Sequence, residues 1–312
     1  MRKEFTPEYV PAQGIVHYLL HGPEHRDAPI LLYLHGGPGF PEHFHALQLE
    51  RAWNGLFTQV HWDQRGAGMT LACNDRTATP QSIDQMTDDL HSIVEHLKRR
   101  YETPRIVILG HSWGSILGSL YALRHPENVA TYVGSGQAVS MRANEREGFM
   151  LALRQAQAAH DAKSVAALEQ LGDYPPADFD ALMSALPTVR KVQEKYEQGA
   201  GGLAIALSVL ADGMFNLRDI PSLVRASKAN RPLLRELVDF NLRAYPARYA
   251  CPVHYILGQD DTTTPTALAG AYFDEIASLR KGMTIIPDAA HSPMFEQPEA
   301  FAKALEVVRA GL

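Results

Sequence analysis

The chain has 312 residues, which is enough for one large domain or for a domain with a sizeable insertion. Its apolar fraction of 46% and charged fraction of 21% are ordinary for a globular protein and exclude disordered and fibrous classes. The net charge of −6 argues against nucleic acid as a partner. No stretch of about 18 consecutive apolar residues occurs, so we expect no membrane-spanning segment.

The two cysteines and the start of the chain predict the cellular setting. Cys73 and Cys251 lie far apart in the sequence and show no metal-ligand spacing, so a disulfide is possible but weakly favoured. The segment Met1–Phe5 carries two basic residues with no apolar run behind them, which is not typical of a signal peptide. These features predict a reduced, cytoplasmic protein that binds no metal.

Short apolar runs alternate with helical patterns in the first 140 residues. The predicted strands are Ile15–Leu20, Ile30–Leu34, Gln59–Trp62, Ile106–Leu109 and Val129–Val133. The nearly continuous apolarity of the second and fourth runs predicts strands that are covered on both faces, as in a parallel sheet with helices on each side. A capping box at Ser82–Gln85 predicts the start of a helix that ends near Lys98–Arg100.

Strand patterns disappear between about residues 140 and 246 and then return. Helical periodicity predicts helices at Asn144–His160, Lys163–Leu171, Ala177–Gln198, Leu203–Ala211 and Pro232–Leu242, with a glycine-rich break at Gly199–Gly202. Beyond them we predict strands at Val253–Leu257 and Met283–Ile286, and helices from Thr266 and Pro298. This pattern predicts one α/β domain, residues 1–139 and 247–312, with a mostly parallel central sheet flanked by helices and an inserted all-helical cap, residues 140–246.

The segment Gly110–Gly114 matches the pattern G-x-S-x-G. It follows a predicted strand directly and precedes a helix, which is the context that the motif requires. The turn has strained backbone angles, so larger side chains two residues on either side of the serine would collide. It would present the Ser112 hydroxyl at the C-terminal edge of the sheet. The alternative, a turn that merely contains a serine, fits this context less well, and we predict that Ser112 is a nucleophile.

A glycine-rich loop, His35–Gly39, follows the predicted strand Ile30–Leu34. Acyl transfer requires two donors aimed at the oxyanion of the tetrahedral intermediate, and backbone N–H groups are the usual ones. One candidate is the N–H of Trp113, directly after the nucleophile, and the other is the N–H of Gly37. The alternative is a tight turn without a catalytic part.

A carboxylate and a histidine follow the last two predicted strands, in the chain order expected after a serine nucleophile. His291 is the predicted general base, because an imidazole can accept the Ser112 proton near neutral pH. Two adjacent aspartates, Asp260 and Asp261, compete for the task of orienting that imidazole.

Three motifs together, His35–Gly39, Asp63–Gly68 and Gly110–Gly114, resemble the proline iminopeptidase family of α/β-hydrolases in order and position. The resemblance covers roughly residues 10–140 and 250–312. It implies the α/β-hydrolase fold, a catalytic role for the predicted α/β domain, and no cofactor. The family's G-x-x-D-x-x-x-P arrangement favours Asp261 over Asp260. It also implies that Asp63 and Arg65 form a local framework of ion pairs and hydrogen bonds beside the oxyanion loop.

The predicted cap departs from that family, because its tryptophan-rich, glutamate-bearing motif is absent. All three tryptophans, Trp53, Trp62 and Trp113, lie in the predicted catalytic domain. Candidate substrate contacts are Gln137, Met214 and Phe215. An N-terminal exopeptidase also needs carboxylates that face the substrate ammonium, although a helical glutamate more often lies on an exposed face. The available glutamates are Glu145, Glu147, Glu194, Glu197 and Glu236.

These residues predict a serine hydrolase that cleaves an amide or ester of a small molecule or short peptide through an acyl-Ser112 intermediate. Prolyl aminopeptidase activity is slightly favoured over carboxylesterase or lactonase activity on a small hydrophobic acyl compound. A non-catalytic receptor with the same fold is a rival, but it would not need to retain all three catalytic groups. A dehalogenase would carry a carboxylate nucleophile where Ser112 stands.

Overall fold

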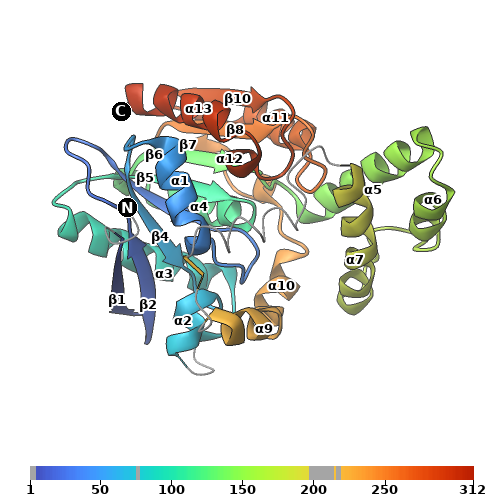
Figure 1. Cartoon of the computed structure of the whole chain (residues 1–312), viewed down its shortest axis with the longest axis horizontal. Helices are drawn as coiled ribbons and strands as arrows, with labels where there is room; N and C mark the ends of the chain where they lie inside the picture. Colours follow the sequence, from blue (N-terminus) through green and yellow to red (C-terminus); the bar gives the residue numbers. More distant parts are fainter. Residues whose placement is uncertain (1–4, 75–77, 197–213, 216–218) are drawn as a thin grey trace.

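The computed structural model describes residues 5–74, 78–196, 214–215 and 219–312. An eight-stranded sheet in the order β1-β2-β4-β3-β5-β6-β8-β10 forms its centre (Figure 1). β1 and β2 form an antiparallel hairpin at one edge, β2 pairs antiparallel with β4, and the pairs from β4 to β10 are parallel. The strands are β1 (Thr6–Ala12), β2 (Ile15–His21), β3 (Ile30–Leu34), β4 (Thr58–Asp63), β5 (Ile106–His111), β6 (Val129–Ser135), β8 (Val253–Gly258) and β10 (Lys281–Ile286).

Helices cover both faces of the sheet, and this explains the continuous apolarity of its central strands. Every residue of β3 and β5 is buried, as their sequences predict. One face packs against α3 (Ile83–Arg100), α4 (Trp113–Arg124) and α11 (Thr266–Glu275). The other face packs against α1 (Ala46–Trp53) and α13 (Pro298–Ala310). The prediction of an α/β fold with a mostly parallel sheet flanked by helices is confirmed.

The capping box at the start of α3 is only half formed. The Ser82 hydroxyl accepts a hydrogen bond from the Gln85 N–H, as predicted. The Gln85 amide oxygen, however, accepts from the N–H of Gln81 instead of Ser82. The helix ends at Arg100, so its last turn carries three basic side chains that complement the C-terminal end of the helix dipole.

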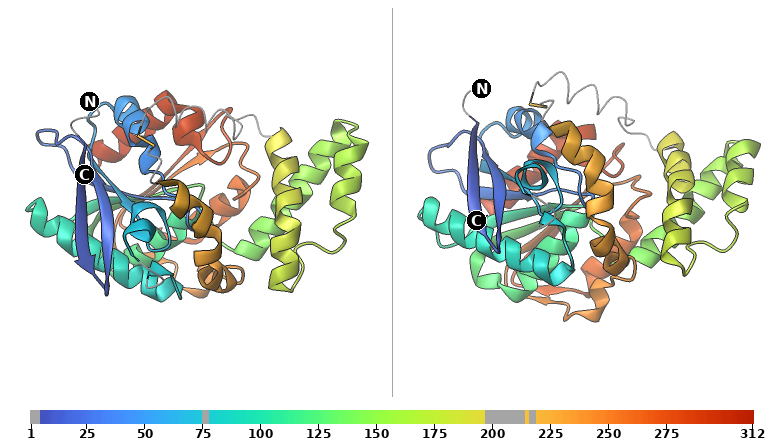
Figure 2. Two further views of the ribbon diagram at one scale, coloured as in Figure 1. Left: turned by 60° about the horizontal axis from the view of Figure 1, so that its bottom comes forward. Right: turned by 90° about the horizontal axis from the view of Figure 1, so that it is seen from below.

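Residues 140–246, which we call the helical segment, lie between β6 and the next strand. Three of its helices, α5 (Met141–Ala158), α6 (Ala162–Glu169) and α7 (Phe179–Tyr196), stand away from the α/β body (Figures 1 and 2). They share a small core of their own, with residues such as Phe149, Leu168 and Val189. Two further described helices, α9 (Ile220–Ala229) and α10 (Arg231–Leu237), pack against the body, on α2 (Gly68–Cys73) and α3 respectively.

Several elements escaped prediction, β1 and α9 among them. β1 contains Pro7 and Pro11, and a strand with two prolines is tolerated here because β1 is the outermost strand of the sheet. α9 was also missed, although Pro221 lies in its first turn, where proline is well accommodated. The predicted helix Leu203–Ala211 and the break at Gly199–Gly202 lie outside the described residues.

Shorter elements complete the chain. They are the 3₁₀ turns η2 (His43–His45), η4 (Pro126–Asn128) and η6 (Leu242–Ala244), the helices α2 (Gly68–Cys73) and α12 (Pro293–Glu296), and a two-stranded ribbon of β7 (Arg248–Tyr249) and β9 (Ala277–Ser278). Cys73 and Cys251 are both free thiols. Among the described helices, none combines the length and apolarity that crossing a bilayer would need.

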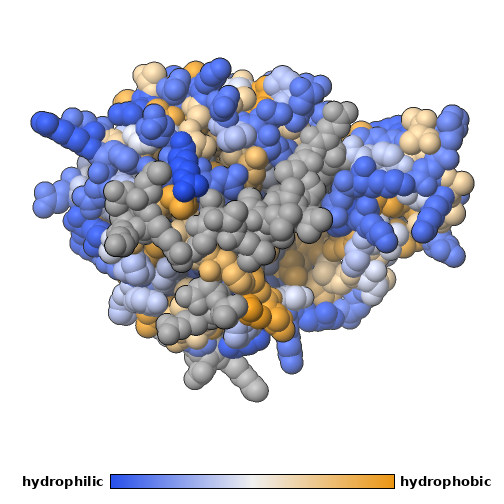
Figure 3. Space-filling model, in the orientation of Figure 1, coloured by the Kyte–Doolittle hydropathy of each residue, from blue (hydrophilic) through white to orange (hydrophobic). Residues whose placement is uncertain are grey.

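The coloured part of the face seen in the space-filling view is mostly hydrophilic (Figure 3). An apolar strip lies over α9, where Ile220 and Val224 are 43% and 76% exposed. The part of the surface that matters for chemistry lies elsewhere, at the C-terminal edge of the parallel strands.

Candidate active site

Parallel strands bring their C-terminal ends to one edge of a sheet, and the predicted site residues follow four of these ends. The loop with Gly37 follows β3, Ser112 follows β5, Asp261 follows β8 and His291 follows β10. Three side chains far apart in the sequence therefore meet over the middle of the sheet.

The turn from β5 into α4 explains both glycines of the motif. Ser112 has φ 55° and ψ −118°, a combination that strains a residue with a side chain. A Cβ at Gly110 would lie 2.3 Å from the Gly114 carbonyl oxygen. A Cβ at Gly114 would lie 2.1 Å from the Leu34 carbonyl oxygen. The tight turn thus depends on glycine at both positions and holds Ser112 at the tip.

A relay of hydrogen bonds links the three predicted catalytic groups. The Ser112 hydroxyl donates to Nε2 of His291 over 3.0 Å. Nδ1 of His291 donates to Oδ2 of Asp261, also over 3.0 Å. The His291 side chain is 19% exposed, so substrate can reach it, whereas the Asp261 side chain is only 2% exposed. In this arrangement the imidazole can accept the serine proton while the carboxylate fixes its tautomer.

Asp261, and not its neighbour Asp260, faces His291. Its carboxylate also accepts hydrogen bonds from the backbone N–H groups of Thr263 and Thr264, at 2.9 and 2.8 Å, and from the Thr264 hydroxyl at 2.7 Å. Burial alone would raise the pKa of Asp261, but the charge of His291 and these hydrogen bonds lower it below its ordinary value. Asp261 therefore stays ionised beside the imidazole.

The loop after β3 lies against the nucleophile. A Cβ at Gly36 would approach the Ser112 Cβ to 3.1 Å, and Gly37 has a φ of 111° that favours glycine. Trp113 is the first residue of α4, so its N–H is one of the donors that a helix start leaves unpaired. Trp113 thus follows Ser112 directly, and Gly37 comes one residue after Gly36, the glycine that lies against Ser112.

Asp63 and Arg65 take part in a framework of ion pairs and hydrogen bonds, and their partners lie outside the segment Asp63–Gly68 or at its end. Arg65 pairs with Asp89 on α3, through Nε–Oδ2 and Nη2–Oδ1 contacts of 2.6 and 2.8 Å. Asp63 instead binds Nδ1 of His43 at 2.7 Å and accepts from the Met69 N–H at 2.7 Å.

Gln64 supplies the link between this framework and the catalytic loops. Its Nε2 donates to the His35 carbonyl at 3.0 Å, and its Oε1 accepts from Nε1 of Trp113 at 2.8 Å. Nε2 of His35 in turn accepts from the Gln64 N–H at 3.2 Å. Gln64 therefore fixes the oxyanion loop and the nucleophile turn relative to each other.

A cavity of about 230 Å³ separates the oxyanion loop from the helical segment. Its wall is mostly apolar, with Leu182, Met183 and Leu186 from α7, and Gly37 lies at its catalytic end. The lining also holds a charged pair, the buried Glu145 and Arg190, whose side chain is 30% exposed, and the two bind each other. The second oxygen of Glu145 accepts from the Tyr174 hydroxyl at 2.6 Å. The remaining lining residues are Met141, Arg142, Leu234, Leu237 and Val238.

The structure does not place Gln137 in contact with substrate, contrary to the prediction. Gln137 is 1% exposed, and its amide binds Tyr132, Ser119 and the Ala138 carbonyl beneath the site. A loop glutamine whose amide is saturated in this way has a structural role.

The predicted contacts Met214 and Phe215 pack against the α/β body, away from the lining of the cavity. Met214 joins a cluster with Leu20 and Leu47, and Phe215 stacks edge-on against Phe44 at 5.4 Å. Of the glutamates considered for an ammonium site, only Glu145 lines the cavity among those described, and Glu197 lies outside the described residues.

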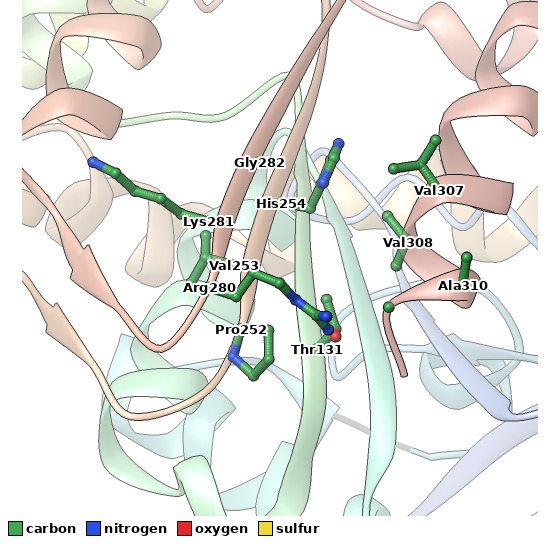
Figure 4. Close-up of a pocket in the computed structure, with 11 residues that line it drawn as sticks. Thr131, Pro252, Val253, His254, Arg280, Lys281, Gly282, Val307, Val308 and Ala310 are labelled. Carbon is green, nitrogen blue, oxygen red and sulfur yellow. The ribbon is translucent and has the colours of Figure 1, made fainter.

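A second cleft, of about 350 Å³, opens at the opposite edge of the sheet (Figure 4). It is lined by residues at the N-terminal ends of two strands, such as Val253 and Lys281, and by the end of α13. Because parallel strands share their direction, this cleft lies a strand length away from Ser112. Within the described part of the chain, no three His, Cys, Asp or Glu side chains gather as a metal site would require.

Sequence reasoning missed three residues that surround His291. His111, inside the G-x-S-x-G motif, lies with its ring 5.1 Å from the His291 ring. Glu42 binds His111. Glu296 accepts hydrogen bonds from the N–H groups on both sides of His291. Only the position of His111 beside the nucleophile could have signalled this cluster.

Residues 31–304 match the family model described as the alpha/beta hydrolase family. A protein of Bacillus subtilis named a probable aminopeptidase, YbaC, is 25% identical over 280 residues, covering 89% of this chain and 87% of that protein. RutD of Shigella flexneri, named as a carbamate hydrolase, is 25% identical over 90% of this chain and 91% of its own. The crystal structure of proline iminopeptidase from Mycobacterium smegmatis superimposes with a TM-score of 0.69 at 20% identity, covering 98% and 99% of the two chains.

The chain therefore belongs to the alpha/beta hydrolase family, and it is a hydrolase. Within that family it is similar to proline iminopeptidases, as its three sequence motifs predicted.

Proposed function

We propose that the protein is a serine hydrolase that cleaves an amide or ester bond through an acyl-Ser112 intermediate. The relay of two 3.0 Å hydrogen bonds from Ser112 through His291 to Asp261 is the observation that carries this proposal. Its geometry is that of a nucleophile, a general base and a carboxylate that orients the base.

In the proposed reaction the Ser112 oxygen attacks the substrate carbonyl carbon while Nε2 of His291 takes the hydroxyl proton. The N–H groups of Gly37 and Trp113 stabilise the oxyanion that forms. His291 then donates the proton to the leaving group, whose bond to the carbonyl carbon breaks. Water attacks the acyl-serine with the same base and releases the acid and free Ser112. This chemistry needs no cofactor or metal.

We further propose that residues 140–246 act as a cap over a catalytic domain made of residues 1–139 and 247–312. The cavity supports this division, because α5, α7 and α10 supply most of its wall and the oxyanion loop closes its end. A small, mostly apolar cavity would exclude water from the reacting bond and select the acyl group. The substrate is accordingly a small molecule or a short peptide.

Aminopeptidase-like cleavage of prolyl amides is our leading substrate proposal. The names of YbaC and of the proline iminopeptidases to which the chain is similar support it. Glu145, 5% exposed at the cavity wall, is a carboxylate suited to an N-terminal ammonium.

One observation favours a second candidate, an esterase acting on an uncharged hydrophobic acyl group. Glu145 already binds Arg190 and Tyr174, so its charge is neutralised before any substrate arrives. An incoming ammonium would have to displace Arg190, whereas a neutral acyl group would not. The carbamate hydrolase name of RutD is also compatible with a substrate that lacks a free N-terminus.

Turnover of prolyl-β-naphthylamide and of p-nitrophenyl esters of short acids separates the two candidates. The aminopeptidase proposal predicts prolyl amide turnover that falls at least tenfold in Glu145→Gln, because the ammonium loses its partner. Glu147→Gln, on the same helix but outside the cavity lining, is the matched control. Ester turnover without any prolyl amide turnover would rule out the aminopeptidase. If Ser112→Ala kept both the prolyl amide and the ester turnover of the wild type, the serine hydrolase proposal would be ruled out.

A further inference from the structure

The main chain around His291 is held from two sides. Nε2 of His111 donates a hydrogen bond to the His291 carbonyl oxygen over 3.0 Å. On the other side, the Glu296 carboxylate accepts from the N–H groups of Ala290 and Ser292, the latter at 3.1 Å. The imidazole of His291 is therefore positioned through its backbone as well as through Asp261.

Both ring nitrogens of His111 face acceptors. Nδ1 lies 3.0 Å from Oε1 of Glu42, and Nε2 lies 3.0 Å from the carbonyl oxygen of His291. A neutral imidazole has one N–H and can donate only one of these bonds. Donating both requires an imidazolium, paired here with a Glu42 carboxylate. The two side chains are 5% and 7% exposed, so this ion pair is buried.

The charge states of the pair agree with its geometry. Burial alone would raise the pKa of Glu42, but the charge of His111 lowers it to about 2. Burial alone would likewise lower the pKa of His111, but Glu42 raises it above its ordinary value. The alternative, a neutral His111 that accepts a hydrogen bond from a protonated Glu42, is thus disfavoured.

We propose that His111, charged and held by Glu42, is a positioning residue that fixes the His291 backbone so that its imidazole stays between Ser112 and Asp261. The inference rests on the proposed function, since it concerns the same base. It assigns a task to the variable second position of the G-x-S-x-G motif and to a glutamate 69 residues away from it.

The same pair also acts on the charge of His291. The groups that face the His291 imidazole are Asp261, Thr264 and Ser112, together with the His111 ring at 5.1 Å. Asp261 favours the protonated imidazole, whereas the His111 cation disfavours a second positive charge nearby. Glu42 lies behind His111 and partly offsets that cation.

Two variants separate the positioning effect from the charge effect. Glu42→Gln keeps a neutral His111 that can still donate to the His291 carbonyl, because the new amide can donate to Nδ1. The double variant His111→Leu/Glu42→Met removes both charges and fills their space with apolar side chains. Removing only one partner would leave an unpaired buried charge, which destabilises the fold more. His125→Gln is the matched control, since His125 pairs with Glu127 at the far end of α4.

The experiment measures kcat, KM and the pH profile of kcat/KM for the best substrate. We expect kcat of the double variant to fall at least tenfold with KM within twofold, and a smaller fall in Glu42→Gln. We expect the acid limb of the Glu42→Gln profile to differ in position from that of the wild type, because the charge beside the His291 ring has changed. His125→Gln should match the wild type in all three quantities.

A folded double variant with wild-type kcat and pH profile would overturn the inference. If that variant does not fold, an unchanged acid limb in Glu42→Gln would overturn it instead. A wild-type protein without turnover and without Ser112 labelling by a fluorophosphonate would overturn the proposed function, and this inference with it.

Discussion

The α/β body and the helical segment differ in how firmly they hold their functional groups. In the body, Ser112, Asp261 and His291 extend from loops that follow buried parallel strands, and hydrogen bonds tie those loops to one another. In the helical segment, α5, α6 and α7 share only a small core and stand away from the sheet. The proposed catalytic groups thus lie on loops that buried strands hold in place, whereas the proposed substrate-facing side chains lie mainly on helices with a small core of their own.

The charged pairs of the two regions show the same contrast. In the body, Asp261 binds Nδ1 of His291, and Nε2 of His291 faces the Ser112 oxygen. Glu145 and Arg190 line the wall of the cavity and neutralise each other. We therefore expect substitutions in the body to act on the rate of the chemical step, and substitutions in the helical segment to act on the choice of substrate.

The largest effect should come from Ser112→Ala. Without the nucleophile, kcat should fall by about four to six orders of magnitude, as for serine hydrolases in general. The fold should persist, because the methyl group of alanine fits the same turn, and the melting temperature should change by no more than a few degrees. Steady-state hydrolysis and thermal denaturation measure the two quantities. Ser92→Ala on α3 is the control, and equal activity of the two variants would contradict the account.

Asp261→Asn should be the next largest. The backbone N–H groups of Thr263 and Thr264 hold the amide oxygen in the place of Oδ1, so the amide NH2 faces Nδ1 of His291 and donates to it. This favours the wrong tautomer of His291 and removes the carboxylate charge, which lowers kcat by about 10³- to 10⁴-fold. Asp260→Asn tests the adjacent residue with the same chemical change and should stay within about threefold of the wild type. Measuring kcat for both variants at neutral pH decides between them. The reverse ranking would show that Asp260 orients the base.

A cavity substitution in the helical segment should have a medium effect that depends on the substrate. Leu186→Ala enlarges the cavity, so kcat/KM for a short-chain ester should fall by about tenfold relative to a longer one. The rate of labelling by a small fluorophosphonate should not change, because the catalytic relay is intact. Val165→Ala, in the core of the same segment but outside the cavity lining, is the control. An equal loss for all substrates would mean that the two regions do not divide their tasks.

The smallest effect should be on stability, and it should depend on pH. Glu42 has a folded pKa of about 2 against an ordinary 4.5, so it contributes stability above pH 4.5 that is lost as the pH falls toward 2. His111 has a raised pKa, so its contribution is complete below pH 6.5 and is lost as the pH rises through the folded value. The stability of the wild type relative to His111→Leu/Glu42→Met should therefore be greatest between pH 4.5 and 6.5. The melting temperatures of the two proteins, measured from about pH 3 to about pH 9, should differ by a few degrees inside this window and by less on either side of it. A difference that stays the same over the whole pH range would contradict the ion pair.

Much of the α/β body could be predicted because its signals are local. β3 and β5 are continuous apolar runs, and the glycines around Ser112 mark a tight turn within five residues. β1 was missed because Pro7 and Pro11 oppose strand formation unless the strand lies at an edge, and sequence alone does not show which strand is outermost.

The sequence predicted a site residue only where that residue directly follows a predicted strand, because the strand places it at the C-terminal edge of the sheet. His291 and one of two aspartates were placed by the strands before them, but only the structure shows that Asp261 points toward His291. Glu42 and His111 meet across 69 residues and have no shared motif, so their contact could not be inferred. Gln137 lies close to the site in sequence, yet its amide turns into the interior.

The most direct test of the catalytic relay is to treat the wild type and His291→Ala with a fluorophosphonate and to map the adduct by peptide mass spectrometry. The account predicts one adduct per chain, on Ser112, that forms at least a hundredfold more slowly in the variant. An adduct on another residue, or equal rates for both proteins, would contradict it.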